Sequence, residues 1–239
     1  MEGSFAGPLW RRTTDGERAL SVTGIRISAV TIGATPRPDL TDQLRAAMPD
    51  ADIVEVGALD DLPPGVTPPD PGADGYPLRT KGPGGRTIVA DESWLAPRVQ
   101  AAVERGGAGA ADLTILLCAG GFGSVVAEGP LIRPFDAAVD RLRTIGARRL
   151  GVMVPIPGQL LPSRAKWLAA GFEVEVVAGS PAEAGRLLNS TPQLDAIVLD
   201  YVGHSAADIT AARAVVAPEI PVIDLLAVAI EAAVATMAE

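Results

Sequence analysis

Residues 112–123 read DLTILLCAGGFG, and this stretch decides the fold that the sequence predicts. Its largely apolar run ends at Cys118, the one cysteine of the chain, which stands just before Gly120 and Gly121. A short apolar run bounded by glycines is typical of a buried strand in a parallel sheet. Ligands of open α/β sheets bind where the loops leave the carboxyl ends of such strands. We therefore expect Cys118 at a ligand-binding edge, either as a reactive thiol or as a small buried side chain.

Strands and helices are expected to alternate along the rest of the chain. Residues 134–145, for example, set Phe135 and Leu142 against Asp136 and Arg143, as an amphipathic helix does. Glycines within 82–85, between two alternating runs, predict a β-hairpin. The order predicts the α/β class, with parallel sheets and helical crossovers. Strands are expected at 25–32, 52–56, 76–81, 86–90, 113–117, 150–154, 173–177, 196–199 and 221–223, and helices at 40–48, 92–104, 134–145, 161–170, 181–188, 206–216 and from 224 onward.

The two halves of the chain also resemble each other. A strand ending in TIG at Thr31 is echoed by a strand leading into VPIP at Val154, and LLCAGG around Cys118 is echoed by LDYVGH around Asp200. Two similar α/β halves would place their strand-end loops face to face across a cleft. We predict two pseudo-symmetric parallel-sheet lobes, with the hairpin inserted in the first. The predicted parts are an extension (1–24), a first lobe (25–148, joined by the closing helix 224–239) and a second lobe (149–223).

Composition argues against several classes of function. The formal net charge is −9, with 20 Lys and Arg against 29 Asp and Glu and no basic stripe, which argues against a nucleic-acid partner. A single cysteine cannot form an internal disulfide, so a cytoplasmic location is expected. The sequence contains no apolar run long enough to span a membrane, and residues 1–24 lack the apolar core of a signal peptide. We therefore expect neither nucleic acid nor a membrane as a partner.

Six blocks of sequence, taken in order, resemble the AroM family. They are TIGATPRPD (31–39), EVGALDDL (55–62), YPLRTKGPGGRTIVADE (76–92), LLCAGGF (116–122), GVMVPIPGQ (151–159) and LDYVGH (199–204). The resemblance covers about residues 25–239. The AroM family is similar in fold to the aspartate/glutamate racemase superfamily, which implies a racemase-like pair of lobes. Its name reflects a genetic association with aromatic amino-acid metabolism.

The resemblance also implies a mechanism. Racemases of this fold set two cysteines on opposite faces of a bound carboxylate, one from each half, so that one removes the α-proton and the other returns a proton. Here the first position matches Cys118 and the second matches Tyr201. A tyrosine, with a pKa of about 10, is a weaker base near neutrality than a cysteine, with a pKa of about 8.5. A two-thiol racemisation is therefore excluded, whereas a one-sided proton transfer, as in decarboxylases of this fold, stays open.

Further candidate residues follow the ends of the predicted strands. Arg37 suits a carboxylate clamp, because a guanidinium binds carboxylate through two hydrogen bonds, and a solvated loop arginine is the alternative. His204 suits acid–base chemistry near neutral pH, or else caps a helix or lies on the surface. Asp200 would orient Tyr201 or His204, or cap the next helix. Beside catalytic Cys118 and Tyr201, the predicted substrate-binding residues are Thr31, Arg37, Ala119, Gly120, Gly121, Pro155, Gln159, Asp200 and His204.

The glycines after Cys118 carry a further expectation. Backbone N–H groups next to glycines can approach a bound anion, and such donors would also lower the pKa of the thiol. One cysteine and one histidine do not make a metal site, and GGFG lacks the spacing of a dinucleotide-binding loop. We therefore expect no metal and no cofactor.

Two classes of function stay open. The first is a racemase/isomerase-like or decarboxylase-like enzyme that acts on a small carboxylate by proton transfer through Cys118, with the amides near 119–121 and the Tyr201 hydroxyl holding the ligand. The second is a non-catalytic protein that binds a small anion and is linked to aromatic amino-acid metabolism. Fold relatives are often dimers, so a homodimer is expected by analogy.

Overall fold

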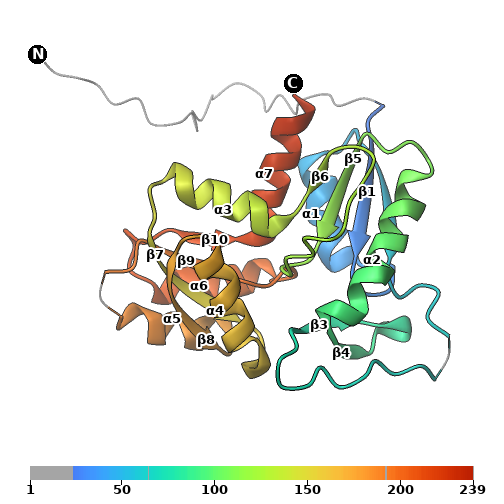
Figure 1. Ribbon diagram of the computed structural model, residues 1–239. Coiled ribbons are helices and arrows are strands. Elements are labelled where there is room, and N and C mark those ends of the chain that lie inside the picture. The colour runs from blue at the N-terminus through green and yellow to red at the C-terminus, as the bar shows by residue number, and fades with distance from the viewer. Residues whose placement is uncertain (1–23, 64, 192, 239) are drawn as a thin grey trace, which may run out of the picture.

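The protein forms two α/β lobes that lie side by side, as the computed structural model shows (Figure 1). The structure describes residues 24–63, 65–191 and 193–238, so the extension predicted over 1–24 lies almost wholly outside the described residues. Within this part of the chain, the strands form two parallel sheets of four strands and one two-stranded hairpin. The predicted α/β class, with two parallel-sheet lobes, is confirmed.

The two sheets have the same order of strands. The first runs β2-β1-β5-β6 and the second β8-β7-β9-β10, so each strand of one sheet has a counterpart in the other. The first sheet is made of β1 (Arg26–Thr31), β2 (Asp52–Gly57), β5 (Leu113–Leu117) and β6 (Leu131–Ile132). The second is made of β7 (Arg149–Val154), β8 (Glu173–Ala178), β9 (Ala196–Leu199) and β10 (Val222–Asp224).

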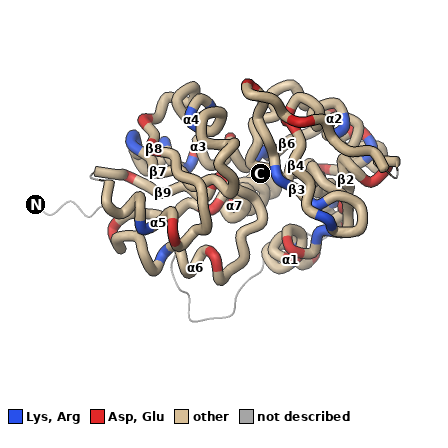
Figure 2. Tube along the Cα trace, turned by 90° about the horizontal axis from the view of Figure 1, so that it is seen from below, with Lys and Arg blue, Asp and Glu red and all other residues tan. Residues whose placement is uncertain are grey.

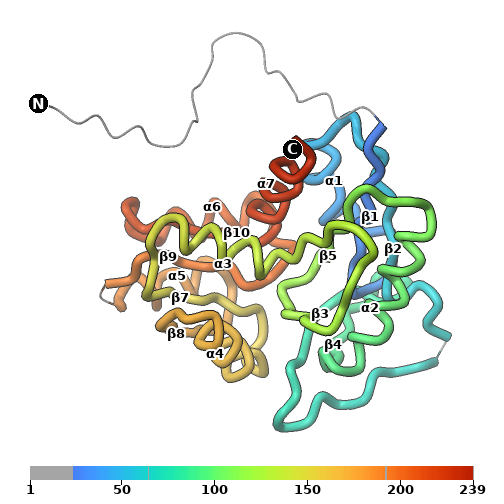
Figure 3. The backbone as a smooth tube through the Cα atoms, turned by 45° about the horizontal axis from the view of Figure 1, so that its top comes forward, coloured from blue at the N-terminus to red at the C-terminus, as the bar shows by residue number. Residues whose placement is uncertain are grey.

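The helices follow the same repetition. The first lobe carries α1 (Pro38–Ala47), α2 (Glu92–Gly107) and α3 (Pro134–Thr144), and the second carries α4 (Leu160–Ala169), α5 (Pro181–Asn189), α6 (Ala206–Val215) and α7 (Leu225–Met237). Helix α3 follows β6 and α7 follows β10, so these two helices occupy equivalent places in the two halves. They pack against each other between the lobes (Figure 3).

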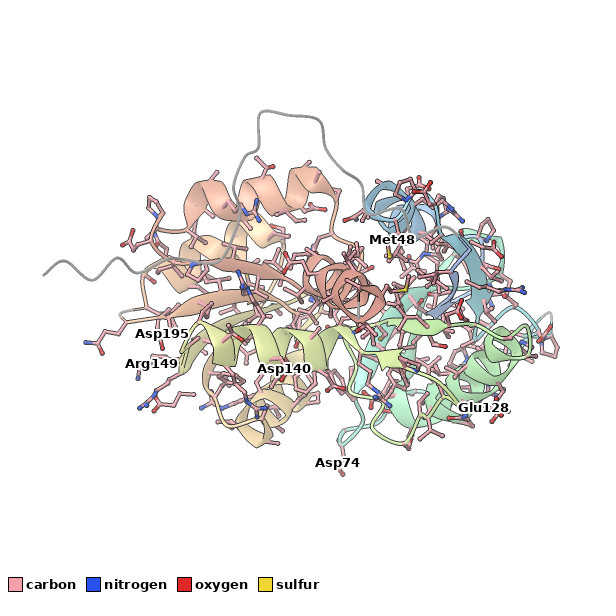
Figure 4. All side chains as sticks on the ribbon, turned by 90° about the horizontal axis from the view of Figure 1, so that it is seen from above. Met48, Asp74, Glu128, Asp140, Arg149 and Asp195 are labelled. Carbon is pink, nitrogen blue, oxygen red and sulfur yellow. The ribbon has the colours of Figure 1, made fainter. Side chains whose placement is uncertain are left out.

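Helices α3 and α7 each reach the opposite lobe. Phe135 of α3 meets Trp167 of α4 edge-to-face, with ring centroids 4.8 Å apart. Helix α7 in turn contacts α1, β5 and β6 of the first lobe. Its buried Leu225 and Leu226 share one apolar cluster with Met48, which follows α1 and is labelled in Figure 4. The apolar side of the closing helix is thus covered within its own chain.

The hairpin of β3 (Pro77–Lys81) and β4 (Thr87–Asp91) is inserted between β2 and α2, as predicted. Its turn is a short 3₁₀ segment, Pro83–Gly85, in which Gly84 has φ of 74°, a conformation that glycine adopts without strain. Ala34 N donates to Lys81 O at 2.8 Å and ties the hairpin to the loop after β1. This attachment holds the hairpin at the carboxyl end of the first sheet.

Most element bounds lie within two residues of those predicted, and 196–199 coincides with β9. One strand, β6, was not predicted, because two residues that pair with Thr114 and Ile115 leave no periodic pattern. Among the described residues, no helix is long and apolar enough to cross a membrane. Charged residues are dispersed over both lobes rather than gathered in one stripe (Figure 2).

Candidate functional site

A small cavity lies where the carboxyl ends of β1, β5 and β9 meet, and both lobes and the hairpin contribute to its wall. The volume open to the centre of a water-sized sphere is about 20 Å³, which is room for about one water molecule. Admission of even a small carboxylate therefore requires the walls to move apart. The lining residues are Ile32, Arg37, Leu40, Leu78, Arg79, Thr80, Leu117, Cys118, Ala119, Gln159, Asp200, Tyr201 and Val202.

Cys118 is buried in this wall, with 5% of its surface exposed, just past the end of β5. Its Sγ accepts a hydrogen bond from Gly120 N at 3.3 Å. Burial raises the pKa of the thiol to about 12; the Gly120 donor and the Lys166 charge oppose this rise, and Glu92 adds to it. The expected donor is present and lowers the pKa of the thiol as expected, but desolvation outweighs it, so the net shift of the pKa is upward. At neutral pH the group is an S–H, which can give up a proton.

The backbone makes the same kind of turn at Tyr201, after β9, as it makes at Cys118, after β5. Cys118 N donates to Leu116 O at 2.9 Å, and Tyr201 N donates to Leu199 O at 2.8 Å. In each case the amide bonds the carbonyl two residues earlier, which closes a γ-turn at the strand end. The two side chains therefore leave equivalent backbone turns on the two lobes and line the same cavity.

The carboxylate of Asp200 is occupied by hydrogen bonds from three side chains of helix α4. Its Oδ2 accepts hydrogen bonds from Ser163 Oγ at 2.6 Å and from Trp167 Nε1 at 2.9 Å. Its Oδ1 accepts one from Lys166 Nζ at 2.8 Å. The same ammonium donates to Ala119 O at 2.7 Å and so reaches across to the Cys118 loop. Sequence reasoning missed Lys166, since nothing local marks a helical lysine as buried.

The roles expected of Asp200 are therefore filled in other ways. Its carboxylate bonds neither Tyr201 nor His204 in the described structure. The helix that follows is capped instead by Ser205, whose side chain accepts from Asp208 N while the Asp208 side chain accepts from Ser205 N. The interpretation of Asp200 as a helix cap or as an orienting group for its neighbours is wrong.

Arg37 lines the cavity, but its donors are already occupied. It is 4% exposed, so the alternative of a solvated loop arginine is wrong. Its Nε and Nη2 donate to Asp39 Oδ1 at 2.9 Å and Oδ2 at 2.8 Å, and Nη1 donates to Thr31 Oγ1 at 3.4 Å. These hydrogen bonds hold the pKa of Asp39 below its usual value. An external carboxylate would have to displace Asp39 to use this guanidinium as a clamp.

Arg79 of β3 supplies a second guanidinium, which the sequence analysis did not single out. Its Cζ lies over the Tyr201 ring, 5.1 Å from the ring centroid, so it crosses from the first lobe to the second. The residue is half-buried, and in the part of the chain that the structure describes its guanidinium has no hydrogen-bond acceptor and no carboxylate partner. The hairpin pattern indicated that Arg79 points away from Leu78 and Thr80, but not that this side meets the other lobe.

Gln159 enters the cavity from a 3₁₀ turn, Pro157–Gln159, that leads into α4. It is 4% exposed, and its Oε1 is buried without a hydrogen-bond partner in the described structure. His204 lies outside the lining but packs edge-to-face on Tyr201, with ring centroids 5.2 Å apart. Burial lowers the pKa of His204, and Asp208 opposes that shift. The imidazole is thus a half-buried neutral neighbour of the site rather than a surface group.

Six of the predicted site residues line the cavity: Cys118, Tyr201, Arg37, Ala119, Gln159 and Asp200. The other five do not line it: Thr31, Gly120, Gly121, Pro155 and His204. Thr31 Oγ1 accepts from Gly33 N at 3.3 Å and supports the loop after β1. Gly120 is required by packing, because a Cβ there would lie 2.7 Å from Phe122 Cε2. Among residues 24–63, 65–191 and 193–238, no group of three or more His, Cys, Asp or Glu side chains could hold a metal ion.

A wider hollow, of about 600 Å³, lies near the amino-terminal end of β5. Small apolar residues and the carboxylates of Glu104 and Glu128 line it, and Glu128 is labelled in Figure 4. Two negative groups disfavour a carboxylate ligand, and the wall contains no cysteine or tyrosine. Its size alone does not make it the better candidate, so the small interlobe cavity is retained.

Comparison with solved structures identifies the fold. Allantoin racemase from Klebsiella pneumoniae superimposes with a TM-score of 0.62 at 19% identity, covering 90% of this chain and 88% of that chain. Maleate isomerase Iso from Pseudomonas putida S16 gives 0.57 at 15% identity, covering 90% and 93%. Arylmalonate decarboxylase gives 0.59 at 13% identity, covering 89% and 92%. At such identities the likeness shows a shared racemase-like fold.

The family is shown by sequence. No curated protein matches the chain. A family profile described as AroM protein, however, matches residues 27–237, which includes both lobes, the hairpin and every residue of the cavity. The chain belongs to the AroM family.

Proposed function

We propose that this protein is a cofactor-independent enzyme that protonates a small carboxylate at the carbon next to the carboxylate group, with Cys118 as the acid. The observation that carries this proposal is a neutral thiol at a strand end in the interlobe cavity, with a pKa raised by burial to about 12. The solved structures that share the fold are named as a racemase, an isomerase and a decarboxylase, which supports chemistry beside a carboxyl or carbonyl group.

The proton balance favours an acid over a base. The S–H bond of Cys118 breaks as its proton moves to the planar carbanion carbon of an enediolate, and the electron pair of the carbanion forms the new C–H bond. The thiolate left behind accepts the Gly120 N–H and lies near the Lys166 charge, both of which lower the thiol pKa. Water then returns a proton to sulfur. A thiol with a pKa of about 12 is by contrast seldom ionised near neutrality, so it is poorly suited to begin a racemisation.

The proposal therefore favours a decarboxylase-like route among the alternatives. Loss of CO₂ from a substrate with two carboxyl groups on one carbon generates the enediolate without a protein base. Tyr201, on the opposite lobe, lines the same cavity and has a hydroxyl that can donate to an enediolate oxygen. In this role it assists as a hydrogen-bond donor and is not a second proton carrier.

A decarboxylation and exchange assay tests the proposal. Purified protein would be incubated in D₂O with a panel of 2-substituted malonates and simple 2-hydroxy and 2-amino acids, while NMR follows CO₂ loss and deuterium at the α-carbon. We expect turnover with at least one malonate and a loss of about 100-fold or more in Cys118→Ser, since general acids contribute on this scale. Cys118→Ala provides the variant with no donor at all. Equal turnover by wild type and both variants would remove Cys118 from the mechanism.

A second candidate function is non-catalytic binding of a small anion, linked to aromatic amino-acid metabolism as the family name implies. The observation that favours it is a thiol that stays protonated in the cavity wall, with no second cysteine in the chain. Anion binding without turnover of any substrate in the panel, together with a Cys118→Ser variant that binds equally well, would favour this candidate. A homodimer remains a prediction by analogy, which light scattering of the full chain would test.

A further inference from the structure

Two polar groups from opposite lobes, the half-buried Arg79 and the buried Gln159, line the interlobe cavity without a hydrogen-bond partner among the described residues. Thr80 Oγ1, next to Arg79 in the same lining, is also buried without a partner. Arg79, on the first lobe's hairpin, has no acceptor among the described residues, whereas Arg37 of the same lining donates through Nε and Nη2 to the two carboxylate oxygens of Asp39. Gln159, on the second lobe, is only 4% exposed, and its Oε1 accepts no hydrogen bond in the described structure. A buried acceptor left without a donor costs about 1–3 kcal/mol, so such groups usually mark a missing partner.

The two groups belong to segments that touch. A Cβ at Gly158 would lie 2.9 Å from Pro77 Cγ, so the turn that carries Gln159 packs on the start of the strand that carries Arg79. Only a glycine allows this approach. The contact brings one donor-only group and one unpartnered acceptor to the same wall, from opposite lobes.

Arg79 is arranged to hold an anion. Its guanidinium lies over the Tyr201 ring, at 5.1 Å from the centroid, and a guanidinium stacked on a ring keeps its N–H edge free for a carboxylate. The neutral His204 packs edge-to-face on the same tyrosine ring, and Asp208 faces His204. The charged Arg37 and Asp200 line the same cavity, and each already has its own partner. Neither Asp208 nor any other carboxylate of the described chain bonds Arg79.

We propose that Arg79 and Gln159 form a binding subsite for a small carboxylate that carries a hydrogen-bond donor on the neighbouring carbon, as a 2-hydroxy carboxylate does. The carboxylate binds the Arg79 guanidinium, and the hydroxyl donates to Gln159 Oε1. The inference rests on the proposed function for the location of the site, and it adds the chemistry of the ligand. Tyr201 then positions Arg79 through its ring face.

Calorimetric titration of the full chain with two probes tests the subsite. Glycolate has the hydroxyl and acetate lacks it, while their carboxylates are alike. We expect wild type to bind glycolate about tenfold or more tightly than acetate, and Arg79→Gln to weaken both by about tenfold or more. Gln159→Met keeps the length of the side chain and should abolish the preference between the probes while leaving acetate binding unchanged. Arg86→Gln is the matched control, because Arg86 is an exposed arginine of the same hairpin segment and the change in net charge is equal.

The outcomes separate this inference from the proposed function. Arg79→Gln with unchanged affinity for both probes, or wild type that binds neither, overturns the subsite. Arg79→Lys keeps the positive charge but lacks the paired N–H donors of a guanidinium, and it replaces Arg79→Gln as the test variant if Arg79→Gln unfolds. Full wild-type affinity in the lysine variant would overturn binding of the carboxylate through two guanidinium hydrogen bonds. Loss of glycolate binding in Arg79→Gln supports the subsite even if no substrate turns over. Retained turnover in Cys118→Ser would overturn the enzyme mechanism and leave these binding results standing.

Discussion

Lys166 and Asp200 form an ion pair of 2.8 Å that is buried beside the candidate site, with side-chain exposures of 10% and 0%. The same ammonium donates to Ala119 O at 2.7 Å. Ala119 follows Cys118 in the chain and Asp200 precedes Tyr201, so one charged group joins the two strand ends that carry the candidate pair. Lys166 thus links the two lobes directly beside the thiol.

The first prediction concerns the stability of the buried pair. Lys166→Met leaves Asp200 buried without its counter-charge, so the free energy of unfolding should fall by about 3–5 kcal/mol. Denaturant unfolding at pH 7 measures it. Arg164→Met, on the exposed side of the same helix, is the control and should stay within about 0.5 kcal/mol of wild type. Equal losses in the two variants would mean that the pair contributes nothing specific.

The second prediction concerns the reactivity of Cys118. Because burial raises the pKa of the thiol to about 12, the rate of alkylation by iodoacetamide should rise steadily from pH 7 to pH 10 without levelling off. Mass spectrometry of the single cysteine follows the reaction directly. A plateau near pH 8 would show an activated thiolate and would contradict the acid role proposed for Cys118.

The third prediction concerns His204, the one histidine of the chain. Its pKa is lowered by burial, so its imidazole protons in an NMR titration should shift with a midpoint below the ordinary value of about 6.5. The folded state favours the neutral ring, so His204 contributes stability above about pH 6.5 that is lost as the pH falls through the folded pKa. Asp208 and Arg79 face the ring with opposite effects, and the pKa stays lowered.

Thermal unfolding gives the matching check on His204. The Tm of wild type relative to His204→Gln should fall between pH 7 and pH 5, because only wild type must protonate a buried ring in this range. The difference in Tm between the two proteins removes the effect of the carboxylates, because these titrate in both. A difference that rises toward pH 5 would mean that the charged ring is favoured by the fold.

The fourth prediction concerns Gly33, at the close approach of the β1 loop to the hairpin. A Cβ at this position would lie 2.3 Å from Lys81 O and 2.4 Å from Thr80 Oγ1, so Gly33→Ala must displace β3 and with it Arg79. We expect a loss of about 1–3 kcal/mol in unfolding free energy. Gly107→Ala is the control, because no atom within 4 Å would meet its Cβ and alanine suits a helix better than glycine. Equal stability of the two variants would contradict the packing described.

The local part of the structure could be predicted from the sequence because it depends on short-range patterns. The apolar run that ends at Cys118 forms β5, and the glycines around Gly84 turn the hairpin. The echo between LLCAGG and LDYVGH corresponds to equivalent turns after β5 and β9. Strand β6 escaped prediction, since its two residues are defined only by pairing with β5.

The sequence by itself determined the strand–helix order, the duplication and the place of Cys118 and Tyr201 at two strand ends. Only the tertiary structure decided which charged groups are available there. Arg37 meets its own Asp39, whereas Arg79 crosses to Tyr201 and stays free of a carboxylate in the described chain. Only the tertiary structure decided the burial of Cys118, which raises the pKa of its thiol although the neighbouring backbone donor lowers it. The burial of Cys118 and the stacking of Arg79 on Tyr201 depend on segments far apart in sequence, and no local pattern records which of them meet.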